Sequence, residues 1–208
     1  MGYRIHFLAF PNLPQDKLET SLRQRGSFED DFFSNPQVFV TNESWSAIGV
    51  STRFGICAQF EDVISELKAP SIWITTNETD DWQIRIHDGS GELAKLHIPW
   101  VNVDPEEHQE EDGKEVADEL RASNLPAELQ EKMGALGTSD AWRAFLDYAQ
   151  AELTQSMEKA SIPVDAEKLR LLFSEDDFGD IESHEASQLG YFINAVLGIG
   201  FDLSPADD

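Results

Sequence analysis

The chain has 208 residues, of which 40% are apolar and 10% aromatic, so it is able to fold around a substantial core. Forty acidic residues against fifteen basic ones give a formal net charge of −25 and an isoelectric point near 4.3. Such a field repels phosphate backbones and anionic membrane surfaces, which disfavours direct nucleic-acid binding and binding to a membrane.

The first elements in chain order are a strand, a helix and a pair of strands. Residues 3–10 have the composition of a strand, and residues 15–25 predict a short helix with one apolar face. Residues 37–41 and 46–52 predict two more strands, joined by a turn at Asn42–Ser44. An amphipathic helix ended by Pro70 comes next, with apolar residues at helical spacing: Phe60, Val63, Ile64 and Leu67.

The clearest pattern in the chain predicts a three-stranded antiparallel meander. Residues 72–74 are β-branched and aromatic, and residues 82–87 alternate apolar with polar side chains. Asp88–Gly91 supplies the residues that a tight hairpin turn needs. On the return strand, Leu93 and Leu96 are out of phase with strict alternation, which leaves two registers open: a β-bulge, or pairing with both faces buried.

These elements make residues 1–103 an α+β unit, with a mostly antiparallel sheet and two helices on one of its faces. Residues 104–113 (DPEEHQEEDG) hold six acidic residues and no apolar one, which predicts an acidic linker. From residue 114 to residue 208 the apolar period changes to that of helices, so an all-helical domain or subdomain is expected there.

Five helices are expected in this second half. They are a short one marked by Val116 and Leu120, one from Asn124 to Gly134, one from Ser139 to about Ala160, one after Pro163, and one from Glu185 to about Leu197. The helix from Ser139 has the longest apolar stripe: Trp142, Phe145, Leu146, Ala149, Leu153, Met157 and Ala160. Gly198-Ile199-Gly200 is interpreted as the terminator of the last helix.

The acidic segment Ser174–Glu185 lies between two predicted helices. It resembles the calcium loop of the EF-hand family at the third, sixth, eighth and twelfth positions, which are Asp176, Gly179, Ile181 and Glu185. The resemblance covers this segment and its flanking helices, and it implies a bound calcium ion. Ser174 and Phe178 replace two oxygen ligands of that pattern, so we favour an acidic interhelical loop and predict no calcium.

Five histidines are present: His6, His87, His97, His108 and His184. His87 and His97 would approach each other across the hairpin in one register and could then bind a metal with Asp81 or Glu92. No HExxH, HxH or CxxC spacing supports a metal site. We therefore interpret these two histidines as sheet-surface residues and predict no metal.

Cys57 is the only cysteine, so no intrachain disulfide can form. It lies in an apolar run and is expected to pack as a small hydrophobic residue. A single sequestered thiol fits a reducing cytoplasm, and Met1–His6 lacks the pattern of a signal peptide. The longest uncharged tract, Ala186–Phe201, is too short and too polar to span a bilayer. A cytoplasmic location is the expectation.

No catalytic or cofactor-binding residue is predicted, because the chain has no GxSxG elbow, no Walker A loop and no GxGxxG after a strand. Solubility or a salty habitat is the simplest explanation of the charge. The function we favour is a non-enzymatic protein-binding or accessory module whose acidic surface meets a basic protein partner. Two alternatives stay open: an enzyme with a site in the cleft between sheet and helices, and a DNA-mimic inhibitor.

Overall fold

The computed structural model describes residues 4–24, 38–52, 57–76, 82–98, 125–134, 138–173 and 190–200. The elements of the first half are β1 Arg4–Pro11, α1 Gln15–Arg23, β2 Val38–Thr41, β3 Trp45–Thr52, α2 Cys57–Leu67, β4 Pro70–Thr76, β5 Trp82–Asp88 and β6 Glu92–Ile98. Those of the second half are α4 Ala127–Gly134, α5 Thr138–Lys159, α6 Ala166–Leu172 and the π-helix η1 Phe192–Val196. The α+β class and the order of elements in the first half are confirmed.

Six strands form one sheet in the order β2-β3-β1-β4-β5-β6, and every pairing is antiparallel. The first strand of the chain therefore lies inside the sheet, between β3 and β4. The hairpins β2–β3 and β5–β6 form its two ends. Alternation along the strands gives the sheet two apolar faces, and each of them needs a cover.

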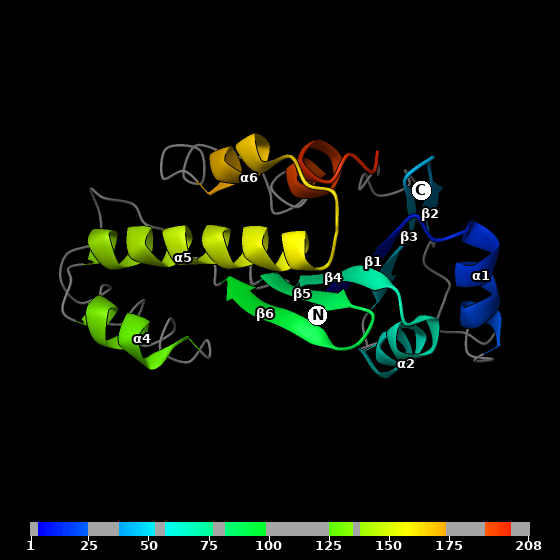
Figure 1. Cartoon of the computed structure of the whole chain (residues 1–208), viewed down its shortest axis with the longest axis horizontal. Coiled ribbons are helices and arrows are strands. Elements are labelled where there is room, and N and C mark those ends of the chain that lie inside the picture. The colour runs from blue at the N-terminus through cyan, green and yellow to red at the C-terminus, as the bar shows by residue number, and fades with distance from the viewer. Residues whose placement is uncertain are drawn as a thin grey trace.

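Helices α1 and α2 cover one face of the sheet, as the sequence predicts (Figure 1). The apolar residues between them and the sheet are Leu8, Phe10, Leu18, Leu22, Ile48, Val50, Phe60, Val63, Ile64 and Trp73. Helices α5, α6 and η1 cover the opposite face, where α5 packs against β6 and β5. One core cluster joins this face to the second-half helices, so residues of both halves share a core. The predicted boundary at 104–113 and the helix at Val116–Leu120 lie outside the described residues.

The β5–β6 hairpin contains the bulge that the sequence left open. Ile86 pairs with Ala94 and His87 pairs with Glu92, so Leu93 is the extra residue of β6. The bulge puts Ala94 and Leu96 on the face that α5 covers. The Asp88 carboxylate accepts hydrogen bonds from the backbone N–H groups of Ser90 (2.7 Å) and Gly91 (3.0 Å) and from the Ser90 hydroxyl.

Two predicted helices differ from the structure, one in where it ends and one in its type. Helix α2 ends at Leu67, because Lys68 takes a positive φ of 47°, and Pro70 begins β4 instead of ending the helix. The described part of the last predicted helix is mainly π-helical, with the Leu197 N–H donating to the Phe192 carbonyl at 3.0 Å. Its apolar residues recur every three or four positions, a spacing that cannot separate a π from an α turn. Gly198, with φ of 68°, follows as the predicted terminator.

The helix predicted from Ser139 to Ala160 is confirmed as α5, and all seven residues of its apolar stripe are buried. Within the described ranges, no helix combines the length and the apolar character needed to cross a membrane.

Candidate functional site

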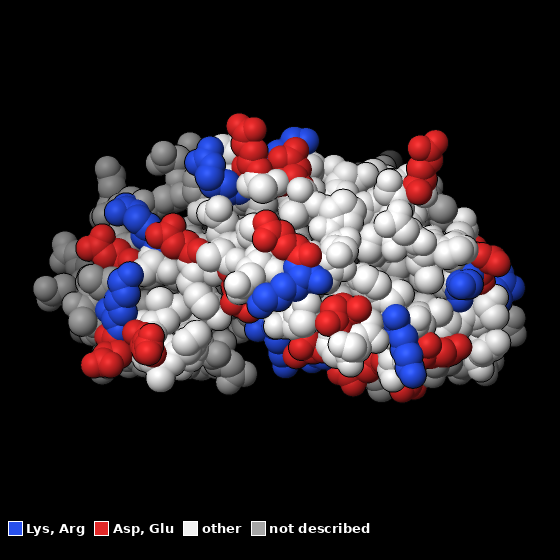
Figure 2. Space-filling view, viewed as in Figure 1, with Lys and Arg blue, Asp and Glu red and all other residues white. Residues whose placement is uncertain are grey.

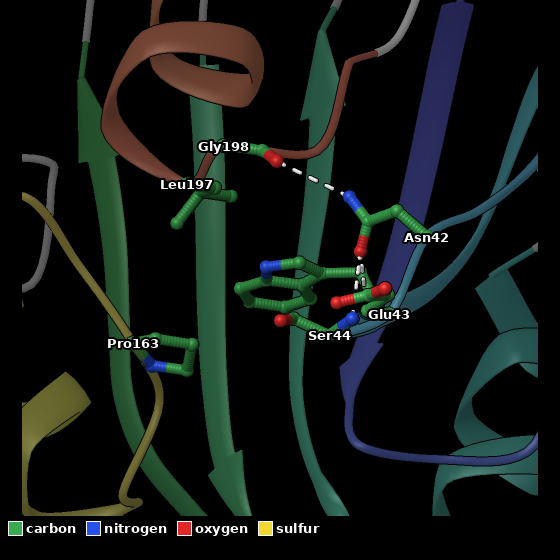
Figure 3. Close-up of a pocket in the computed structure, with 7 residues that line it drawn as sticks. Asn42, Glu43, Ser44, Pro163, Leu197 and Gly198 are labelled. Carbon is green, nitrogen blue, oxygen red and sulfur yellow. Dashed lines mark hydrogen bonds between the residues drawn. The ribbon is translucent and has the colours of Figure 1, made fainter.

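A hollow of about 380 Å³ opens at the rim of the layer between the sheet and the second-half helices. Three segments distant in sequence line it: the β2–β3 turn, the α5–α6 connection and the chain after η1. The lining residues are Asn42, Glu43, Ser44, Trp45, Pro163, Leu197 and Gly198 (Figure 3). Its volume is at the lower end of the range of small-ligand pockets, roughly 300–1,000 Å³.

The Asn42 side chain joins two walls of this hollow. Its Oδ1 accepts hydrogen bonds from the backbone N–H groups of Ser44 (2.8 Å) and Trp45 (2.9 Å), which fixes the turn. Its Nδ2 donates to the carbonyls of Gly198 and Ile199, both at 3.2 Å (Figure 3 draws the bond to Gly198). One side chain therefore holds the β2–β3 turn against the chain after η1.

Further backbone hydrogen bonds fix the same region. The Asn12 N–H donates to the Ser44 carbonyl at 2.8 Å, which attaches the turn to the end of β1. The Asp165 N–H donates to the Val196 carbonyl at 3.0 Å, which attaches the α5–α6 connection to η1. The walls of the hollow are thus held by the fold before any ligand enters.

The hollow has an apolar floor and one carboxylate at its edge. Trp45 and Leu197 are buried, and Pro163 completes the apolar wall. Glu43 and Ser44 are exposed at the turn, and Glu43 makes no ion pair within the described part of the chain. A single carboxylate beside apolar surface suits a cationic group on an aliphatic stem. Glu43 is the one titratable residue among those that line the hollow, so the lining offers no acid–base pair.

A second polar group, which we name the Arg85 cluster, lies where α2 meets β5 and β6. It comprises Arg85, Glu61, Glu92, His87 and Trp73. The Arg85 guanidinium lies 4.6 Å from the centre of the Trp73 ring, and its Nη1 is 2.8 Å from Glu61 Oε1. Its Nε is 3.7 Å from Glu92 Oε2. The ion pair with Glu61 joins α2 to β5, while the cation–π contact joins β5 to β4 and the ion pair with Glu92 joins β5 to β6.

Ser71, His87 and Glu92 form one cross-strand row of the sheet, since Ser71 pairs with His87 and His87 with Glu92. The residue types are those of a catalytic triad, but the geometry is not. Ser71 is 0% exposed, and its hydroxyl has no hydrogen-bond partner in the described structure. His87 Nε2 is 3.9 Å from Glu92 Oε2, too far for a hydrogen bond. The row holds no activated serine nucleophile.

The histidine pair considered from the sequence does not form. His87 lies opposite Glu92, whereas His97 lies opposite Gln83, further along the hairpin. Of the two acids considered beside them, Glu92 is close to His87 and Asp81 lies outside the described residues. Over the described ranges, no three His, Cys, Asp or Glu residues are arranged to hold a metal ion.

The remaining candidate residues are placed as follows. His6 is fully buried, with Nδ1 3.3 Å from the Thr75 hydroxyl and its ring beside Phe60 and Trp73. Cys57 is the first residue of α2, and the surroundings of its side chain lie outside the described structure. His108, His184 and the segment Ser174–Glu185 also lie outside it, so the prediction of an acidic loop without calcium stays a prediction.

Acidification is expected to destabilise the fold through His87. Burial lowers the pKa of His87 below its usual 6.5, and Arg85 lowers it further against the opposing effects of Glu92, Asp88 and Glu61. Below pH 6.5 the unfolded chain therefore binds a proton that the folded chain does not. The contribution of neutral His87 to stability is complete above that pH and is lost as the pH falls from 6.5 through the lowered pKa.

The measurement is the free energy of unfolding in urea at about pH 7.5 and about pH 5.5. His87→Gln is expected to reduce the difference between the two values. Gln83→Ala, which changes a residue of β5 that does not titrate, should keep the pH dependence of the unmodified protein. If His87→Gln kept the pH dependence of the unmodified protein, the attribution of acid destabilisation to His87 would be wrong.

Charge is distributed unevenly along the chain. Residues 104–113 and residues 174–185 each hold six acidic residues and no Lys or Arg. Figure 2 shows acidic and basic side chains interspersed among the described residues of one face. Part of the acidity is therefore concentrated in two segments, residues 104–113 and 174–185.

Comparisons with protein-family models, curated proteins and solved structures gave no match to the chain.

Proposed function

We propose that the protein is a binding or accessory module whose acidic segments meet a basic protein partner. The observation that carries the proposal is the distribution of charge. The helices, strands and connections described above, which we call the framework, mix acidic and basic side chains, whereas residues 104–113 and 174–185 together hold twelve acidic residues and no Lys or Arg. A solubility or habitat effect would be expected to spread acidic residues over all exposed positions. Concentrated acidity is better explained by electrostatic attraction to a partner.

The two alternatives predict other features. A DNA mimic needs carboxylates at regular spacing along one face, and the described residues in Figure 2 mix the two signs instead. An enzyme needs reactive groups that converge in a pocket, and the hollow at the β2–β3 turn is lined by a single titratable residue. Partner capture in low and moderate salt distinguishes both alternatives from a binding module.

Neutralising the acidic residues of 104–113 to Asn or Gln is expected to weaken partner capture at least about tenfold. The residues changed are Asp104, Glu106, Glu107, Glu110, Glu111 and Asp112. The measurement is capture from native lysate in low and moderate salt, with captured proteins identified by mass spectrometry. A basic protein whose capture is salt-sensitive is the expected result.

The matched control neutralises six framework acids, so that both variants have the same net charge. These are Glu128, Glu131, Asp147, Glu152, Glu158 and Glu167. The control variant should retain most of the capture. Equal loss in both variants would show that net charge alone matters. Absence of any salt-sensitive partner would overturn the proposal, and capture of a DNA-binding protein that duplex DNA displaces would favour the DNA mimic.

A further inference from the structure

We propose that the hollow at the β2–β3 turn receives a lysine or arginine side chain of the protein partner. This inference rests on the proposed function and names the contact through which the framework itself would bind. The acidic segments attract a basic surface from a distance, whereas a hollow that fits one side chain gives that surface a defined position.

The shape of the hollow suits a long basic side chain. Pro163 and the small exposed parts of Trp45 and Leu197 supply apolar surface for the methylene groups of a lysine or arginine, which pack well against apolar walls. Glu43 stands at the edge, where the charged end of such a side chain would lie. Figure 3 shows Glu43 and Ser44 together on the wall of the hollow that the β2–β3 turn forms.

The charge at this edge is available to a ligand. Glu43 is exposed and makes no ion pair among the described residues, in contrast to Glu61, which is 2.8 Å from Arg85. A ligand cation would therefore not have to displace a basic residue of the framework. A neutral or anionic group would leave the carboxylate without a counter-charge or would be repelled by it.

The backbone of the turn that carries Glu43 is fixed by the fold, which lowers the entropic cost of binding. The Asn42 side chain accepts hydrogen bonds from the Ser44 and Trp45 N–H groups and donates hydrogen bonds to the Gly198 and Ile199 carbonyls. The turn and the opposite wall therefore cannot move apart without losing these bonds. Because these hydrogen bonds use both its oxygen and its nitrogen, the Asn42 amide stabilises the fold and is not the group that recognises the ligand. Recognition in the hollow is thus assigned to Glu43, with Ser44 as a second polar contact.

The direct test uses capped amino acids as probes on ¹⁵N-labelled protein. The probes are Nα-acetyl-lysine methylamide and Nα-acetyl-arginine methylamide, with the uncharged Nα-acetyl-norleucine methylamide as control. The reporter is the indole N–H resonance of Trp45, assigned with Trp45→Phe. A saturable shift with a cationic probe and none with norleucine is the expected result.

Glu43→Gln is expected to weaken binding of the cationic probe about tenfold or more, because it removes the charge and keeps the shape of the side chain. The control is Glu128→Gln, which removes one exposed charge on α4 and should leave binding unchanged. If neither cationic probe shifts the Trp45 resonance, or if Glu43→Gln binds as tightly as the unmodified protein, the inference is overturned.

Capture of the partner separates this inference from the proposed function. Glu43→Gln should reduce capture while the acidic segments stay intact. Full capture by Glu43→Gln, together with loss in the 104–113 variant, would leave the acidic module standing and would overturn the role of the hollow. If a cationic probe binds but Glu43→Gln still captures the partner fully, the hollow takes a small cation and the inference is likewise overturned.

Discussion

Phe145→Ala is expected to lower the free energy of unfolding by about 3–5 kcal/mol. Phe145 is 0% exposed in the core cluster that joins the sheet to the second-half helices, and its ring stacks on Trp142 with centroids 5.3 Å apart. Removing the ring takes away buried apolar area and leaves a cavity that the packed strands can fill only in part. The measurement is equilibrium unfolding in urea, followed by tryptophan fluorescence and by far-UV circular dichroism.

The same experiment tests whether the two halves of the chain fold together. Because sheet and helix residues share one cluster, both probes should report a single transition that moves to lower urea in Phe145→Ala. Leu171→Ala is the control, since Leu171 is 38% exposed and its loss should change stability by no more than about 0.5 kcal/mol. Two separate transitions would show that residues 1–103 and 114–208 are independent domains, and a Phe145→Ala effect near that of Leu171→Ala would contradict the packing.

The parts of the fold that the sequence predicted correctly are those whose signal is local. Alternation over residues 82–87 determines a strand with one buried face, and the apolar stripe of α5 extends over several turns. The turn at Asp88–Gly91 was likewise visible, because Asp and Gly have specific roles in tight turns. Each of these patterns specifies an element without reference to any other part of the chain.

Features that depend on pairing were not predictable in the same way. The bulge at Leu93 settles the register of β6, and the sequence offered it only as one of two possibilities. That register separates the two histidines that the sequence analysis considered as a metal-binding pair, since it sets His87 opposite Glu92 and His97 opposite Gln83. The contact of Arg85 with Glu61 depends on how α2 lies on the sheet, which no spacing in the sequence encodes.

The candidate site was the least predictable part of the molecule. The sequence indicated a turn at Asn42–Ser44 and a helix terminator at Gly198, but nothing connects the two until the chain folds. The available signal was the Asn that opens the turn, because its amide can bond to backbone groups elsewhere. Glu43 is one of forty acidic residues, so its position could not be singled out by residue type.

Gly89→Ala is expected to lower the free energy of unfolding by about 2–3 kcal/mol or more. Gly89 has a φ of 90°, a conformation that side-chain-bearing residues rarely adopt. A Cβ at this position would lie 2.5 Å from the carbonyl oxygen of Lys68, which is backbone and cannot rotate away. Relieving this contact would shift the hairpin turn and the connection from α2 to β4 together. Lys68, which lies in that connection, itself has a positive φ of 47°. Equilibrium unfolding in urea measures the change.

Gly91→Ala is the matched control for this prediction. Gly91 lies in the same turn, its φ is outside the strained range, and a Cβ there would have no neighbour within 4 Å. Its effect should stay within about 0.5 kcal/mol, so the comparison separates the combined effect of the positive φ and the close approach to Lys68 from the general cost of changing a turn glycine. Equal effects at the two positions would mean that the Lys68 carbonyl does not constrain the hairpin. A large effect at Gly89 alone would show that the β5–β6 turn depends on the positive φ of Gly89 and on its close approach to Lys68, the residue that follows α2, which is also the helix that Glu61 and Arg85 hold to the same hairpin.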